Sequence, residues 1–146
     1  MNISSVFDQG KKIPEIYTCD GEDKIPPLTI TNVPASAQSL VLIVEDPDAP
    51  RGTWDHWVVW NIDPKTAKIA EGIAPKATYG KNSAGTLEWH GPCPPDGEHR
   101  YFFKLYALDT RLDLPQGSSK RELLEVMEGH IIEKAQVVGR YGRITL

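Results

Sequence analysis

Three segments of nearly continuous apolar residues dominate the hydrophobic pattern of this chain. They cover residues 39–45, 56–62 and 100–108 and are rich in β-branched, leucine and aromatic side chains. Turn-forming clusters of Pro and Asp follow the first two segments. Short apolar runs bounded by such clusters are typical of buried strands. We therefore expect these three segments to form the centre of one sheet.

Weaker patterns predict the remaining elements. Shorter strands are expected at residues 4–7, 28–31, 68–71 and 137–146. A helix is expected over about residues 119–135, because Ser119 and Glu122 have the spacing of a capping box and precede a helical apolar period. That period consists of Leu123, Leu124, Met127, Ile131, Ile132 and Ala135. The apolar face of this helix is expected to pack on the sheet as ordinary core.

Strands joined by turn-rich loops, with a single helical segment late in the chain, favour a mainly β fold. We expect an antiparallel β-sandwich of Greek-key-like type, with one main helix in the C-terminal half packed on it. The chain has 146 residues, 40% of them hydrophobic, which suits one domain spanning residues 1–146.

Composition excludes several function classes. With 16 Lys and Arg against 20 Asp and Glu, the net charge is −4, and no basic run is longer than two residues. A nucleic-acid partner is therefore not expected. The apolar runs are too short for membrane insertion, and no signal-like segment opens the chain. We expect a cytoplasmic protein, in which Cys19 and Cys93 are free thiols rather than a bridged pair.

Polar residues with useful chemistry lie at the ends of the three main strands. Asp46 follows the first strand, whereas His56 and His99 begin the second and third. If the strands are antiparallel neighbours, these three side chains converge on one rim, together with the hydroxyl of Tyr101. Imidazolium, hydroxyl and glycine-rich backbone amides are suited to a small anion such as phosphate. The alternative is that both histidines only close strand ends through backbone hydrogen bonds.

Such a site predicts a pH dependence. If His56 or His99 donates to the anion as imidazolium, binding should strengthen as the pH falls through the region near the ordinary histidine pKa of about 6.5.

Three separated motifs carry a family resemblance. They are Asp46-Pro47-Asp48-Ala49-Pro50, the pair Trp54-x-His56, and Gly91-Pro92-Cys93-Pro94-Pro95 followed by His99-Arg100-Tyr101. In this order they closely resemble the signatures of the phosphatidylethanolamine-binding protein family, also called the Raf kinase inhibitor protein family. The third motif resembles the form found in the bacterial and archaeal branch.

The resemblance implies a β-sandwich with a small anion pocket, and a cis peptide at Asp46–Pro47. The pocket positions that it implies are Asp46, Trp54, His56, Gly91, Pro95, His99 and Tyr101. It also implies a binding protein that modulates a partner such as a kinase or serine protease, and it leaves a homodimer open. The residues themselves offer no activated nucleophile, metal framework or cofactor fingerprint, so we expect no catalytic residues, no cofactor and no enzymatic turnover.

Two rival readings remain open at the level of sequence. His90, Cys93 and His99 lie close together along the chain, and His56 could join them in a metal site. Asp, His and Ser side chains could also make a hydrolase, although residues 80–85 lack the G-x-S-x-G pattern because Lys81 replaces the first required glycine of that turn.

Overall fold

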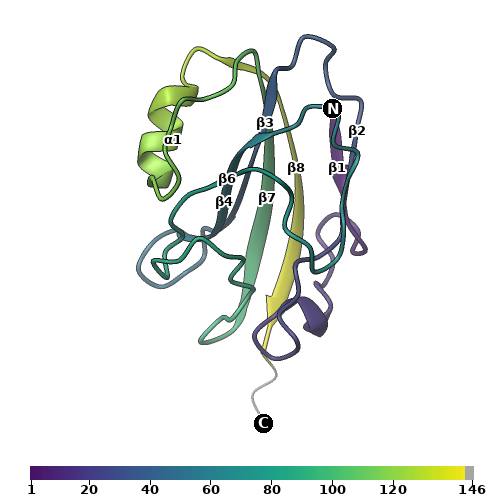
Figure 1. Cartoon of the computed structure of the whole chain (residues 1–146). Helices are drawn as coiled ribbons and strands as arrows, with labels where there is room; N and C mark the ends of the chain where they lie inside the picture. The colour runs from purple at the N-terminus through teal and green to yellow at the C-terminus, as the bar shows by residue number, and fades with distance from the viewer. Residues whose placement is uncertain (144–146) are drawn as a thin grey trace.

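Two antiparallel sheets and a short helix make up the fold (Figure 1). The computed structural model describes residues 1–143. Its elements are β1 (Asn2–Ser4), the 3-10 helix η1 (Glu15–Tyr17), β2 (Leu28–Thr31), β3 (Ser39–Asp46), β4 (Trp54–Ile62), β5 (Lys68–Ile69), β6 (Thr78–Tyr79), β7 (Glu98–Leu108), α1 (Lys120–Met127) and β8 (Ile131–Gly142). The smaller sheet has the order β1-β2-β5 and the larger one the order β6-β4-β3-β7-β8. The predicted mainly β, antiparallel sandwich is confirmed.

The larger sheet is buried on both faces at its centre, as the continuous apolar runs predict. On one face, Leu40, Leu42 and Val44 of β3 belong to the core between the two sheets. On the other face, Val41 and Ile43 pack in a second cluster that includes the helix residues Leu123 and Met127. Strand β3 therefore contributes alternate side chains to two cores.

Helix α1 begins as predicted but is shorter than predicted. Ser119 accepts the Glu122 N–H, and the Glu122 carboxylate accepts the Ser119 N–H, which completes the capping box. The helix ends at Met127, and Gly129 adopts a φ of +82°, a left-handed conformation that glycine adopts at little cost.

Residues 131–135 were predicted as the end of this helix, and that prediction is wrong. They start the long edge strand β8, which pairs antiparallel with β7 from Ile131 opposite Leu108 to Gly142 opposite Glu98. The backbone hydrogen bonds of this ladder replace those that a longer helix would make, so tertiary pairing overrides the local helical period.

Smaller differences concern the short strands. The first strand ends at Ser4 rather than spanning residues 4–7, and Phe7 instead packs its ring 5.7 Å from that of Phe103. Strand β5 ends at Ile69, and β6 has no counterpart in the sequence prediction. Residues 144–146 of the last predicted strand lie outside the described residues.

Two further observations concern the backbone of residues 1–143. No cis peptide bond occurs there, so the cis form implied for Asp46–Pro47 is not found. Within the same range, no helix combines the length and the apolar character needed to span a bilayer.

Candidate functional site

The ends of β3, β4 and β7 surround a cavity of about 660 Å³. Asp46, the last residue of β3, lies opposite Trp54, the first residue of β4, and His99 is the second residue of β7. The residues that line the cavity are Asp46, Ala49, Pro50, Arg51, Gly52, Thr53, Trp54, His56, Ser83, His90, Cys93, Pro94, Pro95, His99 and Tyr101. The structure thus brings together six of the seven residues that the sequence pointed to, all except Gly91.

A β-bulge turns His56 toward this cavity. Val44 pairs with Trp57 and the next residue, Glu45, pairs with Asp55, so His56 is the extra residue of β4. Under strict alternation from the core residue Trp57, the side chain of His56 would face the α1 side of the sheet. Its ring instead lies 5.3 Å from that of Tyr101, edge to face. Bulges often redirect a side chain in this way beside functional sites.

Asp46 orients His99. Nδ1 of His99 lies 2.6 Å from Oδ2 of Asp46, and both side chains are almost fully buried. The other carboxylate oxygen, Oδ1, accepts the backbone N–H of Asp48 at 2.8 Å. Because Nδ1–H donates to the carboxylate, Nε2 is the nitrogen that His99 offers to a ligand.

His56 is oriented by a backbone carbonyl. Its Nδ1 lies 2.5 Å from the carbonyl oxygen of His90, and the His90 N–H donates back to the carbonyl of His56 at 3.2 Å. Burial lowers the pKa of His56 from 6.5 to about 4. The ring is therefore neutral at pH 7, with its proton on Nδ1 and a lone pair on Nε2. The sequence-based expectation named either His56 or His99 as an imidazolium near pH 6.5, and for His56 this pKa makes the neutral ring the form present there.

The hydroxyl of Tyr101 lacks a partner. Tyr101 is 1% exposed, and its hydroxyl makes no hydrogen bond within residues 1–143. Its ring packs against both imidazoles, with the His99 ring 6.4 Å away and roughly parallel. Burial raises the pKa of Tyr101, so the hydroxyl stays protonated and can donate. A buried hydroxyl without a partner is costly, and this one borders a cavity.

The rim combines a fixed loop with an exposed aromatic ring. Arg100 donates from its backbone N–H and its guanidinium to Asp48, and this contact lowers the pKa of Asp48 to about 2. The pair connects the loop after β3 to β7. Trp54 is 38% exposed at the mouth, and Arg51 adds a positive charge to the cavity wall.

Gly91 serves packing rather than the cavity. A Cβ at this position would lie 2.5 Å from the backbone oxygen of Tyr17 and 2.0 Å from Oδ1 of Asp23. Only glycine allows the loop that carries His90 to approach the N-terminal segment so closely.

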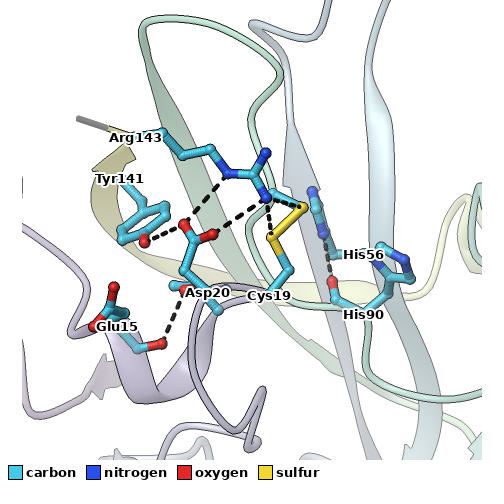
Figure 2. The surroundings of a disulfide bond; sticks show 9 residues. Glu15, Cys19, Asp20, His56, His90, Tyr141 and Arg143 are labelled. Atoms are coloured by element: carbon cyan, nitrogen blue, oxygen red, sulfur yellow. Dashed lines mark hydrogen bonds and ion pairs between the residues drawn. A yellow bond between two sulfur atoms is a disulfide. The ribbon is translucent and has the colours of Figure 1, made fainter. Parts of the chain in front are cut away.

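The two cysteines form a disulfide, so the prediction of free thiols is wrong. Cys19 and Cys93 are bridged across 74 residues of sequence, and the Cys19 N–H donates to the carbonyl of Pro92. Figure 2 shows the Arg143 guanidinium directed at both sulfurs and at Asp20, with His56 and His90 nearby. Because Cys93 also lines the cavity, the bridge is part of the cavity wall.

The disulfide removes Cys93 from the ligand set of the metal hypothesis. Among the residues that the structure describes, no group of three or more His, Cys, Asp or Glu is arranged to hold a metal ion. The arrangement of His90, His99 and His56 in the described residues thus gives no support to the metal site considered from the sequence.

A second cavity, of about 550 Å³, lies beside Asp23 and is lined by the aromatic residues Trp57, Tyr79 and Trp89. It contains none of the seven predicted site residues. Burial raises the pKa of Asp23, whose carboxylate lies against Gly91.

Comparison with known proteins decides the family. The sequence pattern described as phosphatidylethanolamine-binding protein matches residues 3–142. This chain belongs to that family. The resemblance inferred from the three motifs is thereby confirmed, and the family match covers all three of them.

Relatives of this family member come from archaea and bacteria. The "UPF0098 protein" of Methanothermobacter thermautotrophicus is 48% identical over 150 residues, which cover 98% of this chain and 99% of that protein. A crystal structure described as a phosphatidylethanolamine-binding protein homologue from Chlamydia trachomatis is 45% identical, with a TM-score of 0.95 over 98% of this chain and 97% of that one. Escherichia coli YbcL, described as a new member of the mammalian family, is 27% identical with a TM-score of 0.89, covering 98% of each chain.

Sequence reasoning missed three features of this site. It did not assign His90 the carbonyl that orients His56, and it overlooked Arg51, although Arg51 directly follows the first motif. It also left Cys19 unconnected to the site. No local pattern could have revealed the first or third feature, because each depends on a contact between distant segments.

Proposed function

We propose that this family member is a non-enzymatic binding protein whose cavity takes a small phosphate-bearing anion, phosphate or a phosphomonoester. The observation that carries the proposal is the buried hydroxyl of Tyr101, which borders the cavity between two oriented imidazoles and has no partner within the described residues. A phosphate oxygen is an acceptor that would satisfy this donor.

The two imidazoles favour a monoprotonated phosphate over an anion that has no acidic hydroxyl. His56 is neutral and offers a lone pair at Nε2, so it needs a donor, which the P–OH of a phosphate monoanion supplies. Nε2 of His99 accepts when the ring is neutral and donates when the ring is protonated. The ligand thus provides acceptors for Tyr101 and a proton for His56.

The rim favours an ester over inorganic phosphate. Trp54 exposes part of its indole at the mouth, where it can contact an aromatic or alkyl group on the ligand. Arg51 contributes a guanidinium to the same wall and attracts negative charge.

Isothermal titration calorimetry tests this proposal with three probes at about pH 5.5. Phenyl phosphate, largely a monoanion below its second pKa of about 6, is expected to bind most tightly. Inorganic phosphate should bind more weakly because it does not reach Trp54. Phenyl sulfate has the same shape and charge but no acidic hydroxyl, and it should bind at least tenfold more weakly than phenyl phosphate. Equal affinity for phenyl phosphate and phenyl sulfate would contradict the role given to His56.

Absence of turnover is part of this proposal. Cys93 is in a disulfide, and Oγ of Ser83 accepts the Asp55 N–H without bonding to an imidazole among the described residues. Neither is arranged as an activated nucleophile. Incubation with p-nitrophenyl phosphate and p-nitrophenyl acetate should give only background release of nitrophenol. Hydrolysis that the His56→Ala variant abolishes would overturn this part.

The partner and the location are separate proposals. A kinase or serine protease as partner is supported by the family resemblance, and a panel of purified kinases and serine proteases assayed with the protein tests it. A homodimer and a cytoplasmic location stay predictions, which light scattering and cell fractionation check.

A further inference from the structure

We propose that the Cys19–Cys93 disulfide is a redox modification site that sets the affinity of the cavity for its anion. The inference rests on the proposed function of the cavity and adds a form of regulation to it. In the oxidised protein the cavity wall is held in place, and in the reduced protein that wall is released and the anion binds more weakly.

The cavity wall has few other attachments. Three of residues 92–97 are prolines, which have no backbone N–H to donate. Within residues 1–143, and apart from the hydrogen bonds of helices and sheets, one main-chain hydrogen bond involves these six residues. In it the Cys19 N–H donates to the carbonyl of Pro92 at 3.1 Å. Besides the packing of the buried Pro92 and Pro94, the disulfide is therefore the covalent restraint on a segment that supplies Cys93, Pro94 and Pro95 to the cavity.

The bridge also lies close to the group that orients His56. The His90 carbonyl, which accepts the Nδ1–H of His56, is three residues before Cys93. The start of this loop is held separately, since Asn82 donates to the carbonyl of Glu88 at 2.7 Å. Two further contacts hold this stretch, namely the His90 N–H bond to the His56 carbonyl and the packing of Gly91 against Tyr17, and the bridge is the covalent one. Opening the bridge would thus loosen the later part of the loop, including the carbonyl that keeps the proton of His56 on Nδ1.

Reducing agents can reach the bridge, and its surroundings favour reduction. Cys19 and Cys93 are each partly exposed. The Arg143 guanidinium lies 2.9 Å from Sγ of Cys19 and 3.0 Å from Sγ of Cys93. A neighbouring cation stabilises a thiolate, and a stabilised thiolate is the better leaving group in thiol–disulfide exchange.

The reaction is a two-electron exchange with a dithiol. A thiolate of the dithiol attacks one sulfur of the bridge, the S–S bond breaks, and the other sulfur leaves as a thiolate that takes up a proton. The second thiol of the dithiol, as a thiolate, then attacks the reagent's sulfur in the mixed disulfide, that S–S bond breaks, and the protein's cysteine leaves as a thiolate that takes up a proton. Two cysteine thiols form, and the dithiol becomes a disulfide.

Affinity and reduction must be coupled in both directions. If reduction weakens anion binding by a given factor, the bound anion must disfavour reduction by the same factor. The coupling range typical of proteins, about 5-fold to 150-fold, sets the size of the expected effect.

Calorimetry with phenyl phosphate tests the inference on oxidised protein and on protein kept reduced with dithiothreitol. We expect the dissociation constant to rise at least about fivefold on reduction. The Cys19→Ser/Cys93→Ser variant should bind as weakly as the reduced protein, and dithiothreitol should not change its affinity. Saturating phenyl phosphate should also lower the fraction of free thiols in wild-type protein equilibrated with a mixture of reduced and oxidised dithiothreitol. Equal affinity in the oxidised and reduced states would overturn the inference.

A spectroscopic readout separates this inference from the proposed function. In a long-range ¹H–¹⁵N spectrum, His56 of the oxidised protein should show a protonated Nδ1, and this signature should weaken on reduction even if no phosphate binds. An unchanged His56 signature would overturn the inference independently of the ligand. Failure of the oxidised protein to bind phenyl phosphate would instead overturn the proposed function. Circular dichroism of the reduced protein must retain the β-rich spectrum, and global unfolding would also contradict a local release of the wall.

Discussion

Nδ1 of His99 lies 2.6 Å from Oδ2 of Asp46, although 53 residues separate them in the sequence. The contact joins the end of β3 to the start of β7, two neighbouring antiparallel strands. An acidic residue beside an anion site is unfavourable by itself. Here both carboxylate oxygens are occupied, one by His99 and one by the Asp48 N–H, so Asp46 acts as a positioning residue for His99.

Replacing Asp46 by Asn should weaken phenyl phosphate binding about tenfold, because the charge-assisted hydrogen bond that orients His99 is worth about 1.5 kcal/mol or more. Calorimetry measures the change. Asp96→Asn is the matched control. It also removes a carboxylate beside His99, 3.8 Å from Nε2, but this carboxylate is exposed and is not the one that bonds to Nδ1. Wild-type affinity in Asp46→Asn would show that His99 needs no such orientation.

The Tyr101→Phe variant should have opposite effects on stability and binding. It removes a buried hydroxyl that lacks a partner, so the free energy of unfolding of the ligand-free protein should stay the same or rise by up to about 1 kcal/mol. Affinity for phenyl phosphate should fall, because the hydroxyl is assigned to the anion. Urea titration and calorimetry test the two effects. A large loss of stability would mean that the hydroxyl already has a partner in the free protein.

The neutral state of His56 makes stability depend on pH. Its pKa is about 4 in the folded protein and about 6.5 when unfolded, so only the unfolded state takes up this proton between those values. The part of the free energy of unfolding that depends on His56 is at its full value above about pH 6.5. It falls by on the order of 3 kcal/mol as the pH drops toward 4. Urea titrations at several pH values should show a shallower pH dependence in His56→Gln than in the wild type. If the free energy of unfolding changed equally with pH in both proteins, the assignment of His56 as a buried neutral ring would be wrong.

Anion affinity should be highest between about pH 4 and 6. Above about pH 6 the phosphomonoester loses the proton that it donates to His56, and below about pH 4 His56 is protonated and cannot accept it. The expected direction between pH 8 and 6 is that of the sequence-based prediction from a His56 or His99 imidazolium, whereas for the neutral His56 it follows from the proton of the ligand. Calorimetric titrations across this range give the profile. If the affinity for phenyl phosphate were unchanged from pH 5 to 8, the proposed hydrogen bond from the ligand's P–OH to His56 would be refuted.

The sequence was sufficient for the central strands and the family, but not for contacts between distant segments. The runs that became β3 and β4 were clear because they are apolar on both faces, and the run that became β7 was clear because it is long and aromatic. The motifs at the ends of these strands lie around one cavity. The change from helix to strand after Met127 could not be predicted from the sequence. The apolar spacing of residues 131–135 fits a helix locally, and only the pairing of this segment with β7 makes it a strand.

Details of the site depend on tertiary structure in the same way. The bulge at His56 arises from the register between β3 and β4, which hydrophobic alternation does not reveal. The depressed pKa of His56 follows from its burial, and the Cys19–Cys93 bridge joins two segments that also pack together through Gly91 and Tyr17. Two cysteines far apart in a sequence do not indicate whether they meet.

The most direct test of the anion site is a long-range ¹H–¹⁵N spectrum of the imidazole rings, recorded while phenyl phosphate is added to oxidised protein at about pH 5.5. The chain has four histidines, so each ring can be assigned by single substitutions. We predict that the Nε2 signals of His56 and His99 shift together and saturate, while those of His130, which is exposed and paired with Asp109, do not move. Saturable binding that leaves the His56 and His99 rings unchanged would contradict the account.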